Sequence, residues 1–329
     1  MCAECSAAPV PPRAARNRQA APLPPGQRGV ALAVVVWFLA AMSILVGGIV
    51  YQARMDARLT RLQVSEARAV ALADGAIQLA LADMMRIERE GESVSRGTRT
   101  GVYDLAGARV TVGFTPVIGL VDLNLATEEL LFALFAYGAG TGEKVAEELA
   151  LNMIEWRSPA VGGLNDSARE PGFPEPRHGR FQAVEDLMLV PGIGRDIFES
   201  IRDSVYVAQQ GQAGVDWSSA PASVLAILSG GDPDRARELV IERTGDAEPM
   251  VPPADLDLSF QQQQVSSLYR VDALVQFDEE SFLRRRWVDR RRQGGDGLPW
   301  SFFRSEPVQS LNNEQRKKLV GLEYADAGN

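Results

Sequence analysis

The residues that could do chemistry by type and spacing lie in one long loop, residues 155–181. Glu155, Asn165, Asp166 and Glu170 offer hard oxygen ligands, which Ca²⁺ binds six to eight at a time. Their spacing is not that of an EF-hand. Loops of this length are uncommon unless they are functional. Two interpretations stay open: a calcium site held by Glu155, Asp166 and Glu170, or a solvated acidic loop.

Catalytic side chains are scarce. The single histidine, His178, lies in the same Gly- and Pro-rich loop, and the two cysteines, Cys2 and Cys5, lie at the extreme N-terminus. A hydrolase needs a nucleophile beside a positioned base, and no such constellation or metal triad is visible. The sequence therefore predicts a protein that is not an enzyme and has no certain cofactor, with Ca²⁺ as the one candidate.

A short glycine turn, "VPGIG" at residues 190–194, looks like the turn of a helix-hairpin-helix unit. In DNA-binding versions the free amides of this turn hold a phosphate. Acidic residues outnumber basic ones around it: Glu185, Asp186, Asp196 and Glu199 against Arg195 and Arg202. The chain as a whole carries a formal charge of −9. We therefore predict a compact helix pair without nucleic acid, and a membrane-anchored DNA receptor of the competence type remains the alternative.

These residues follow an apolar run near the N-terminus. No charged residue occurs between Arg28 and Arg54, and about 20 apolar residues suffice to cross a bilayer as a helix. A secretory signal has a shorter apolar core and a small-x-small cleavage site. Arginines precede the run, which predicts a single-pass protein with a cytoplasmic N-terminus and the rest outside, crossing the membrane through residues 30–51.

The apolar run continues into an amphipathic stretch. Gly75 is the only helix breaker between residues 52 and 90, and apolar residues recur there at helical spacing. We expect one continuous helix over residues 30–90, with this apolar stripe: Met55, Leu59, Leu62, Val70, Ile77, Leu81 and Met84.

A basic leader ending in glycine, followed by such a helix, resembles type IV prepilins and type II secretion pseudopilins. The resemblance implies that a prepilin peptidase cuts between Gly29 and Val30 and that Val30 is then N-methylated. Most members have glutamate at the fifth mature position, where this chain has Val34. An apolar residue there is the habit of the minor pseudopilin K family (GspK/XcpX family), which is proposed to sit at the pseudopilus tip.

The rest of the chain fits that resemblance. Short β-prone runs at residues 102–105 and 109–115, joined by Ala-Gly, predict a hairpin. "GLVDLNLA", residues 119–126, and "DWSSA", residues 216–220, resemble family segments. Relatives bind calcium in the loop described above, although Ser158 stands where they have an acid. Helices are expected at 128–137, 143–156, 183–189, 195–205, 221–228 and 233–243, and strands return after residue 266.

The predicted fold class is α+β, a type IV pilin-like fold with a long N-terminal helix on an antiparallel sheet. A large all-α domain of helix-hairpin-helix-like units is inserted before the last strands. The expected divisions are a leader (1–29), the helix (30–90), the first part of the sheet (91–125), the inserted domain (126–258), the last part of the sheet (259–315) and a tail (316–329). Arginines 284–286 and 290–292 are expected to pair across strands with Asp278, Glu279 and Glu280.

The resemblance implies a minor pseudopilin of a bacterial type II secretion system that caps the pseudopilus tip and primes its assembly. Implied partners are minor pseudopilins I and J, with H near by, the prepilin peptidase and the inner-membrane secretion platform. The implied location is the bacterial inner membrane, with the C-terminal domain in the periplasm. A minor pilin of a type IV pilus is a further alternative.

Overall fold

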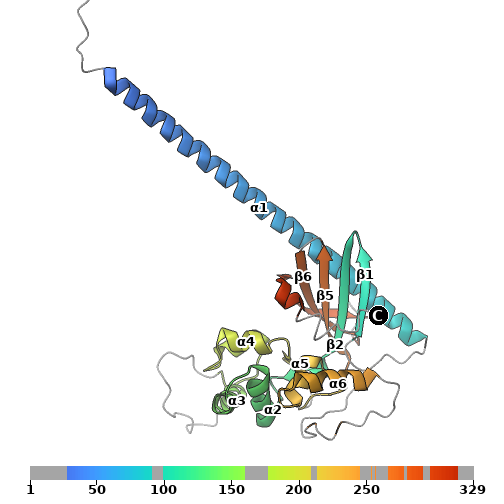
Figure 1. Cartoon of the computed structure of the whole chain (residues 1–329). Helices are drawn as coiled ribbons and strands as arrows, with labels where there is room; N and C mark the ends of the chain where they lie inside the picture. The colour runs from blue at the N-terminus through green and yellow to red at the C-terminus, as the bar shows by residue number, and fades with distance from the viewer. Residues whose placement is uncertain are drawn as a thin grey trace, which may run out of the picture. The chain divides into compact units, whose positions relative to one another are not determined.

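The computed structural model describes residues 28–90, 99–159, 177–208, 213–244, 253, 256, 266–277, 280–291 and 297–317. It divides into two compact units, Met1–Gln63 and Val64–Asn329. Helix α1, Arg28–Arg89, is continuous over 62 residues, as the sequence predicts (Figure 1). In the first unit every described side chain from Val30 to Gln63 is exposed. By length and composition α1 contains a segment that could cross a membrane.

In the second unit α1 packs on an antiparallel sheet through a stripe of small residues. The stripe recurs every three or four positions, and alanines make up most of it: Ala69, Ala73, Ala76, Ile77, Ala80, Leu81 and Met84. They meet apolar side chains on one face of the sheet, among them Val110, Val112, Val271 and Val275. Alanine carries no bulk beyond Cβ, so the helix can approach the sheet closely. Of the apolar stripe noted in the sequence, Ile77, Leu81 and Met84 are buried, Val70 is half-buried, and Met55, Leu59 and Leu62 are exposed.

The sheet has the strand order β1-β2-β5-β6-β7, and β8 pairs with β6. Its strands are β1 Arg99–Leu105, β2 Ala108–Pro116, β5 Leu268–Phe277, β6 Glu280–Asp289, β7 Ser301–Ser305 and β8 Gln309–Ser310. Ala106 and Gly107 both have positive φ, 46° and 80°, which is the two-residue hairpin turn that fits the strand twist. The predicted hairpin is therefore confirmed, and β2 and β5 are neighbours although about 150 residues of sequence separate them.

An inserted helical domain lies between β2 and β5 and has its own apolar core. Its large buried side chains include Leu130, Phe135, Met153, Trp156 and Phe181. Its elements are η1 Val117–Gly119, β3 Val121–Asp122, α2 Glu128–Ala133, η2 Leu134–Gly138, α3 Glu143–Arg157, η3 Val184–Leu189, α4 Arg195–Ile201, β4 Val205–Tyr206, α5 Ala222–Leu228 and α6 Pro233–Thr244. The α+β class, with a long N-terminal helix on an antiparallel sheet and a helical insertion before the last strands, agrees with the sequence prediction.

Three local predictions need correction. The segment expected as an α-helix at 183–189 is the 3₁₀-helix η3, and the helix expected at 195–205 ends at Ile201 because the chain turns into β4. The parallel pair of β3 with β4 was not predicted. Three arginines of β6, and Arg290 directly after it, pair with acids of other elements: Arg284 and Arg286 with Asp74, Arg285 with Asp272 and Asp203, and Arg290 with Glu88. Asp278 and Glu279 lie outside the described residues.

Candidate functional site

The predicted processing site lies in the first turn of α1. The helix begins at Arg28, so the Gly29–Val30 peptide bond stands at its N-terminal end. Val30 and Val34 are both exposed in the first unit, by 63% and 59%. No charged side chain follows until Arg54. Cleavage after Gly29 and methylation of Val30 remain predictions, and the leader up to residue 27 lies outside the described residues.

The glycine turn at residues 190–194 is docked on α3. Gly192 has φ +84°, and a Cβ atom there would lie 2.7 Å from Cδ2 of Leu149. Nδ2 of Asn152 donates to the carbonyl of Pro191 at 3.1 Å. Glycine at this position is thus explained by the close contact with α3 and by the left-handed backbone.

The arginines beside this turn are already paired. Glu199 lies 3.5 Å from Arg195 and 3.2 Å from Arg202, measured between nitrogen and carboxylate oxygen. A phosphate at the turn would have to compete with these carboxylates. The geometry therefore favours the compact helix pair over a DNA-binding hairpin.

Of the three predicted calcium ligands, the structure describes only Glu155. It is half-buried near the end of α3, and Asp166 and Glu170 lie outside the described residues. Within the described ranges, no three His, Cys, Asp or Glu side chains are close enough to share a metal ion. The calcium site stays a prediction.

A buried network of charges joins the sheet to the inserted helical domain. Asp272 of β5 stands directly opposite Arg285 of β6. Nε of Arg285 lies 2.7 Å from Oδ1 of Asp272, and Nε of Arg270 lies 2.9 Å from Oδ2 of the same carboxylate. Nη1 of Arg285 lies 2.6 Å from Oδ1 of Asp203, which follows α4 in the helical domain. Arg270 also donates to the backbone carbonyl of Asp203.

Opposite charges within this network shift the pKa values of Asp203 and Arg285. Burial raises the pKa of Asp203, but the guanidinium groups of Arg285 and Arg270 outweigh burial and bring this pKa to about 2. Burial lowers the pKa of Arg285, and Asp272 and Asp203 more than compensate. Asp203 and Arg285 are therefore both charged near neutral pH, and their ion pair fixes the helical domain to the sheet in one orientation.

A second polar cluster holds the helical domain together around the "GLVDLNLA" segment. Oδ1 of Asn124 accepts from the amide of Phe181 at 2.8 Å, and Nδ2 donates to the carbonyls of Phe181 and Ala208 at 3.1 and 3.0 Å. Oδ1 of Asp122 accepts from the amides of Asn124 and Ala208. Asn124 thus ties the β3 segment to the chain before η3 and to the chain after β4.

Asp122 is the unusual member of this cluster. It is 1% exposed, and its Oδ2 atom is buried with no hydrogen-bond partner in the part of the chain that the structure describes. Burial raises the pKa of this carboxyl, and the amides of Asn124 and Ala208 offset the effect only in part. The sequence reasoning assigned no role to Asp122 or Asn124, and a charged residue in an apolar "LVDLNLA" run was the available signal.

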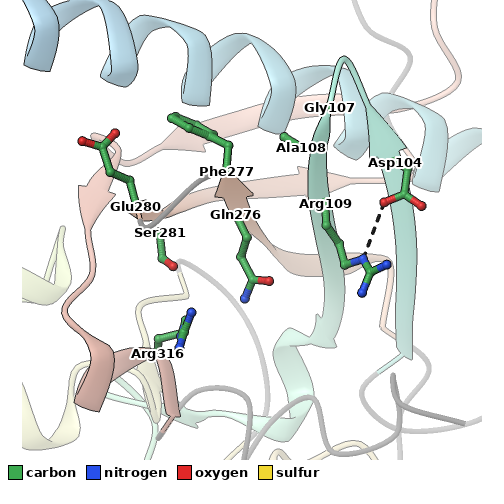
Figure 2. Close-up of a pocket in the computed structure, with 9 residues that line it drawn as sticks. All are labelled: Asp104, Gly107, Ala108, Arg109, Gln276, Phe277, Glu280, Ser281 and Arg316. Atoms are coloured by element: carbon green, nitrogen blue, oxygen red, sulfur yellow. Dashed lines mark ion pairs between the residues drawn. The ribbon is translucent and has the colours of Figure 1, made fainter.

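An open pocket of about 500 Å³ lies at the hairpin end of the sheet. In Figure 2 Phe277 points toward α1, while Gln276, Arg109 and Arg316 extend on the other side. Arg109 is paired with Asp104 at 3.5 Å between Nε and Oδ1. Both signs of charge occur among the lining residues, and none of them is a histidine or cysteine. The pocket therefore offers neither a nucleophile–base pair nor a field of one sign.

Comparison with solved structures finds a likeness, whereas the two sequence comparisons find none. No protein-family model and no curated protein sequence matches the chain. Its structure is similar to a chain in the crystal structure of the GspK-GspI-GspJ complex from the type 2 secretion system of enterotoxigenic Escherichia coli. The TM-score is 0.47 and the identity 16%, over 77% of this chain and 99% of that chain.

Proposed function

We propose that this chain is a minor pseudopilin of a bacterial type II secretion system, which caps the pseudopilus tip and primes pseudopilus assembly. The observation that supports the proposal is the difference in charge and burial between the two parts of α1. Residues 29–53 of α1 carry no charge, and every described side chain from Val30 to Gln63 is exposed within the first unit. Residues 69–84, in the second unit, bury a stripe made mostly of alanines on an antiparallel sheet. A helix surface that buries nothing within its own chain needs an apolar environment from elsewhere, and lipid or the helices of neighbouring subunits would supply it.

The residue at position 34 supports a place at the tip. A subunit inserted beneath another gains from a carboxylate that pairs with the neighbour's N-terminal amine, as the family resemblance implies. An unpaired carboxylate inside the hydrocarbon is costly. Val34 removes that cost, so this subunit can leave the membrane first, before any other subunit stands above it.

The inserted helical domain suits the same role. It has a separate apolar core, and the Arg285 network fixes it to the sheet, so it is a bulky and oriented head. The family resemblance names the expected partners: minor pseudopilins I and J, with H near by, the prepilin peptidase, and the inner-membrane platform. The chain would span the inner membrane once through residues 30–51, with its head in the periplasm.

The experiment that tests the class is processing at Gly29. Mass spectrometry of the membrane-bound protein should find a chain that begins with N-methylated Val30. Gly29→Ala should leave the leader attached, because the peptidase is expected to require glycine before the cut, whereas the matched helix variant Gly75→Ala should be processed normally.

Mature-size protein in Gly29→Ala, or a leader retained in the native protein, would contradict the proposal. Deleting the gene for this chain should stop the export of folded proteins from the bacterium, whereas its surface pili should remain. Loss of pili with normal export would instead select the type IV pilus alternative.

A further inference from the structure

Three arginines follow the apolar segment of α1 at helical spacing. Arg54, Arg58 and Arg61 are four and three residues apart, so they share one side of the helix. All three are exposed. In the residues that the structure describes, none of them forms an ion pair or side-chain hydrogen bond, and Asp56, the one acid among them, lies on another side of the helix. This is a cationic strip with no partner within the described part of its own chain.

The length of the uncharged segment places this strip at the edge of a bilayer. Residues 29–53 carry no charge, and at 1.5 Å per residue they span about 37 Å. The hydrocarbon core is about 30 Å thick, and headgroups extend several ångströms further on each side. Tyr51, which is 69% exposed, lies where tyrosine side chains are enriched at the interface. This step rests on the membrane insertion proposed above.

Side-chain direction brings the strip closer to the headgroups. Side chains on an α-helix lean toward its N-terminus, which for α1 is the membrane side. Arg58 and Arg61 start about 6 and 10 Å further along the axis than Arg54. Long arginine side chains reach back along the helix, so the three guanidinium groups can gather nearer to the lipid than their Cα atoms do.

Membrane orientation does not explain these arginines. Four arginines precede the apolar segment: Arg13, Arg16, Arg18 and Arg28. Four also follow it, within about 21 Å of helix: Arg54, Arg58, Arg61 and Arg68. Positive charge on the exported side weakens the usual orientation signal, so its presence there calls for another role.

We propose that Arg54, Arg58 and Arg61 form a binding surface for anionic phospholipid headgroups in the outer leaflet of the inner membrane. The planar guanidinium fork donates two parallel hydrogen bonds to a phosphate, which suits a phosphodiester at this depth. Lipid is favoured over an acidic protein partner because the strip is continuous with the apolar segment. The bound headgroups hold the subunit at a fixed depth until assembly extracts it.

The test uses the full chain, purified in an uncharged detergent and titrated with phosphatidylglycerol or phosphatidylcholine, with bound lipids counted by native mass spectrometry. Each arginine near an anionic surface strengthens binding about fivefold, so Arg54→Gln/Arg58→Gln/Arg61→Gln should weaken the tightest phosphatidylglycerol binding on the order of 100-fold. The triple lysine variant should retain most of the preference. Leader arginines are present in every variant and contribute the same background.

The control removes equal charge elsewhere, with Arg89→Gln/Arg291→Gln/Arg316→Gln, and should bind phosphatidylglycerol like the wild type. Equal losses in both triple variants, or no loss in the first, would overturn the proposal. Displacement of the lipid by millimolar inorganic phosphate would also overturn it, since the surface would then be a general phosphate site. Unchanged lipid binding by the first triple variant, together with a loss of its binding to partner pseudopilins, would also overturn the proposal. Processing at Gly29 is scored separately, so failure here leaves the proposed function standing.

Discussion

The two apolar cores of the second unit are built in different ways. The core between α1 and the sheet uses small residues on the helix and joins segments that are far apart in sequence, residues 69–84 with 271–300. The core of the inserted helical domain uses large side chains and lies almost wholly within residues 117–256, with Trp287 of β6 added from the sheet. The helical domain is thus close to self-sufficient.

The junction between the two cores is correspondingly polar. Apart from Trp287, the closest ties that cross it are those of Arg270 and Arg285 to Asp203. Ion pairs and hydrogen bonds depend on direction, whereas apolar contacts do not. The contrast shows how a domain with its own apolar core can be oriented on the helix–sheet core through a few charged contacts. Single substitutions can weaken the helix–sheet core, the core of the helical domain or the junction separately.

The largest effect is expected at the junction. Arg285→Met removes the main partner of Asp272 and leaves a carboxylate that is 1% exposed beside Arg270 alone. Removing one partner of a buried pair typically costs 3–5 kcal/mol, roughly, in free energy of unfolding. Urea unfolding of the purified chain in detergent would measure the loss. Arg237→Met, which breaks an exposed pair with Asp234 on α6, should change stability by about 0.5 kcal/mol or less. Equal effects would mean that the junction is not held by its charges.

The next effect concerns the entry to the helical domain. A Cβ atom on Gly119 would lie 2.2 Å from the backbone carbonyl oxygen of Ser219, and the three nearest atoms all belong to the backbone of Ser219 and Ala220, which cannot move as a flexible side chain could. Gly119→Ala should therefore destabilise the chain by roughly 3 kcal/mol. Gly75→Ala is the matched control, because nothing lies within 4 Å of its added Cβ in α1. It should raise stability by about 0.5–1 kcal/mol. Similar destabilisation by both changes would refute the close approach at Gly119.

Much of the fold could be predicted from local patterns. The continuous helix, the Ala-Gly hairpin, the helical insertion and the return to strand all have signals a few residues long. The β3–β4 pair has none, because each strand has two residues and their partners are 84 positions apart. The helix type of η3 has no local signal either, because a six-residue segment does not distinguish a 3₁₀-helix from an α-helix.

The site residues were harder to predict, since the partners of a charge depend on register. The nearby acids Asp278–Glu280 were expected to pair with the arginines of β6. In the structure Asp272 stands directly opposite Arg285 in the register of β5 and β6. The processing site, by contrast, is a linear motif and needs no tertiary contact.

The helix–sheet core should respond to added volume at its alanines. Ala76 is fully buried between α1 and the sheet, and Ala71 is exposed on the same helix. Ala76→Leu should cost about 1–3 kcal/mol, because the sheet would have to move away from the helix. Ala71→Leu should stay within about 0.5 kcal/mol of the wild type. A tolerated Ala76→Leu would indicate a loose contact and would weaken the pilin-like packing.

The smallest effect is a pair of opposite pH dependences, one from the interior of the helical domain at Asp122 and one from its junction with the sheet at Asp203. Asp122 has a raised pKa when folded, so between 3.8 and that value the folded state binds more protons and stability falls as pH rises. Asp203, with a pKa of about 2, does the reverse: between about 2 and 3.8 stability rises with pH. The stability difference between wild type and Asp122→Asn, or Asp203→Asn, should therefore slope in opposite directions, by at most about 1.4 kcal/mol per pH unit. Urea titrations at several pH values measure both slopes. Slopes of the same sign would show that the two carboxylates lie in similar environments, which would contradict the difference between the Asp122 cluster and the charge network at Asp203.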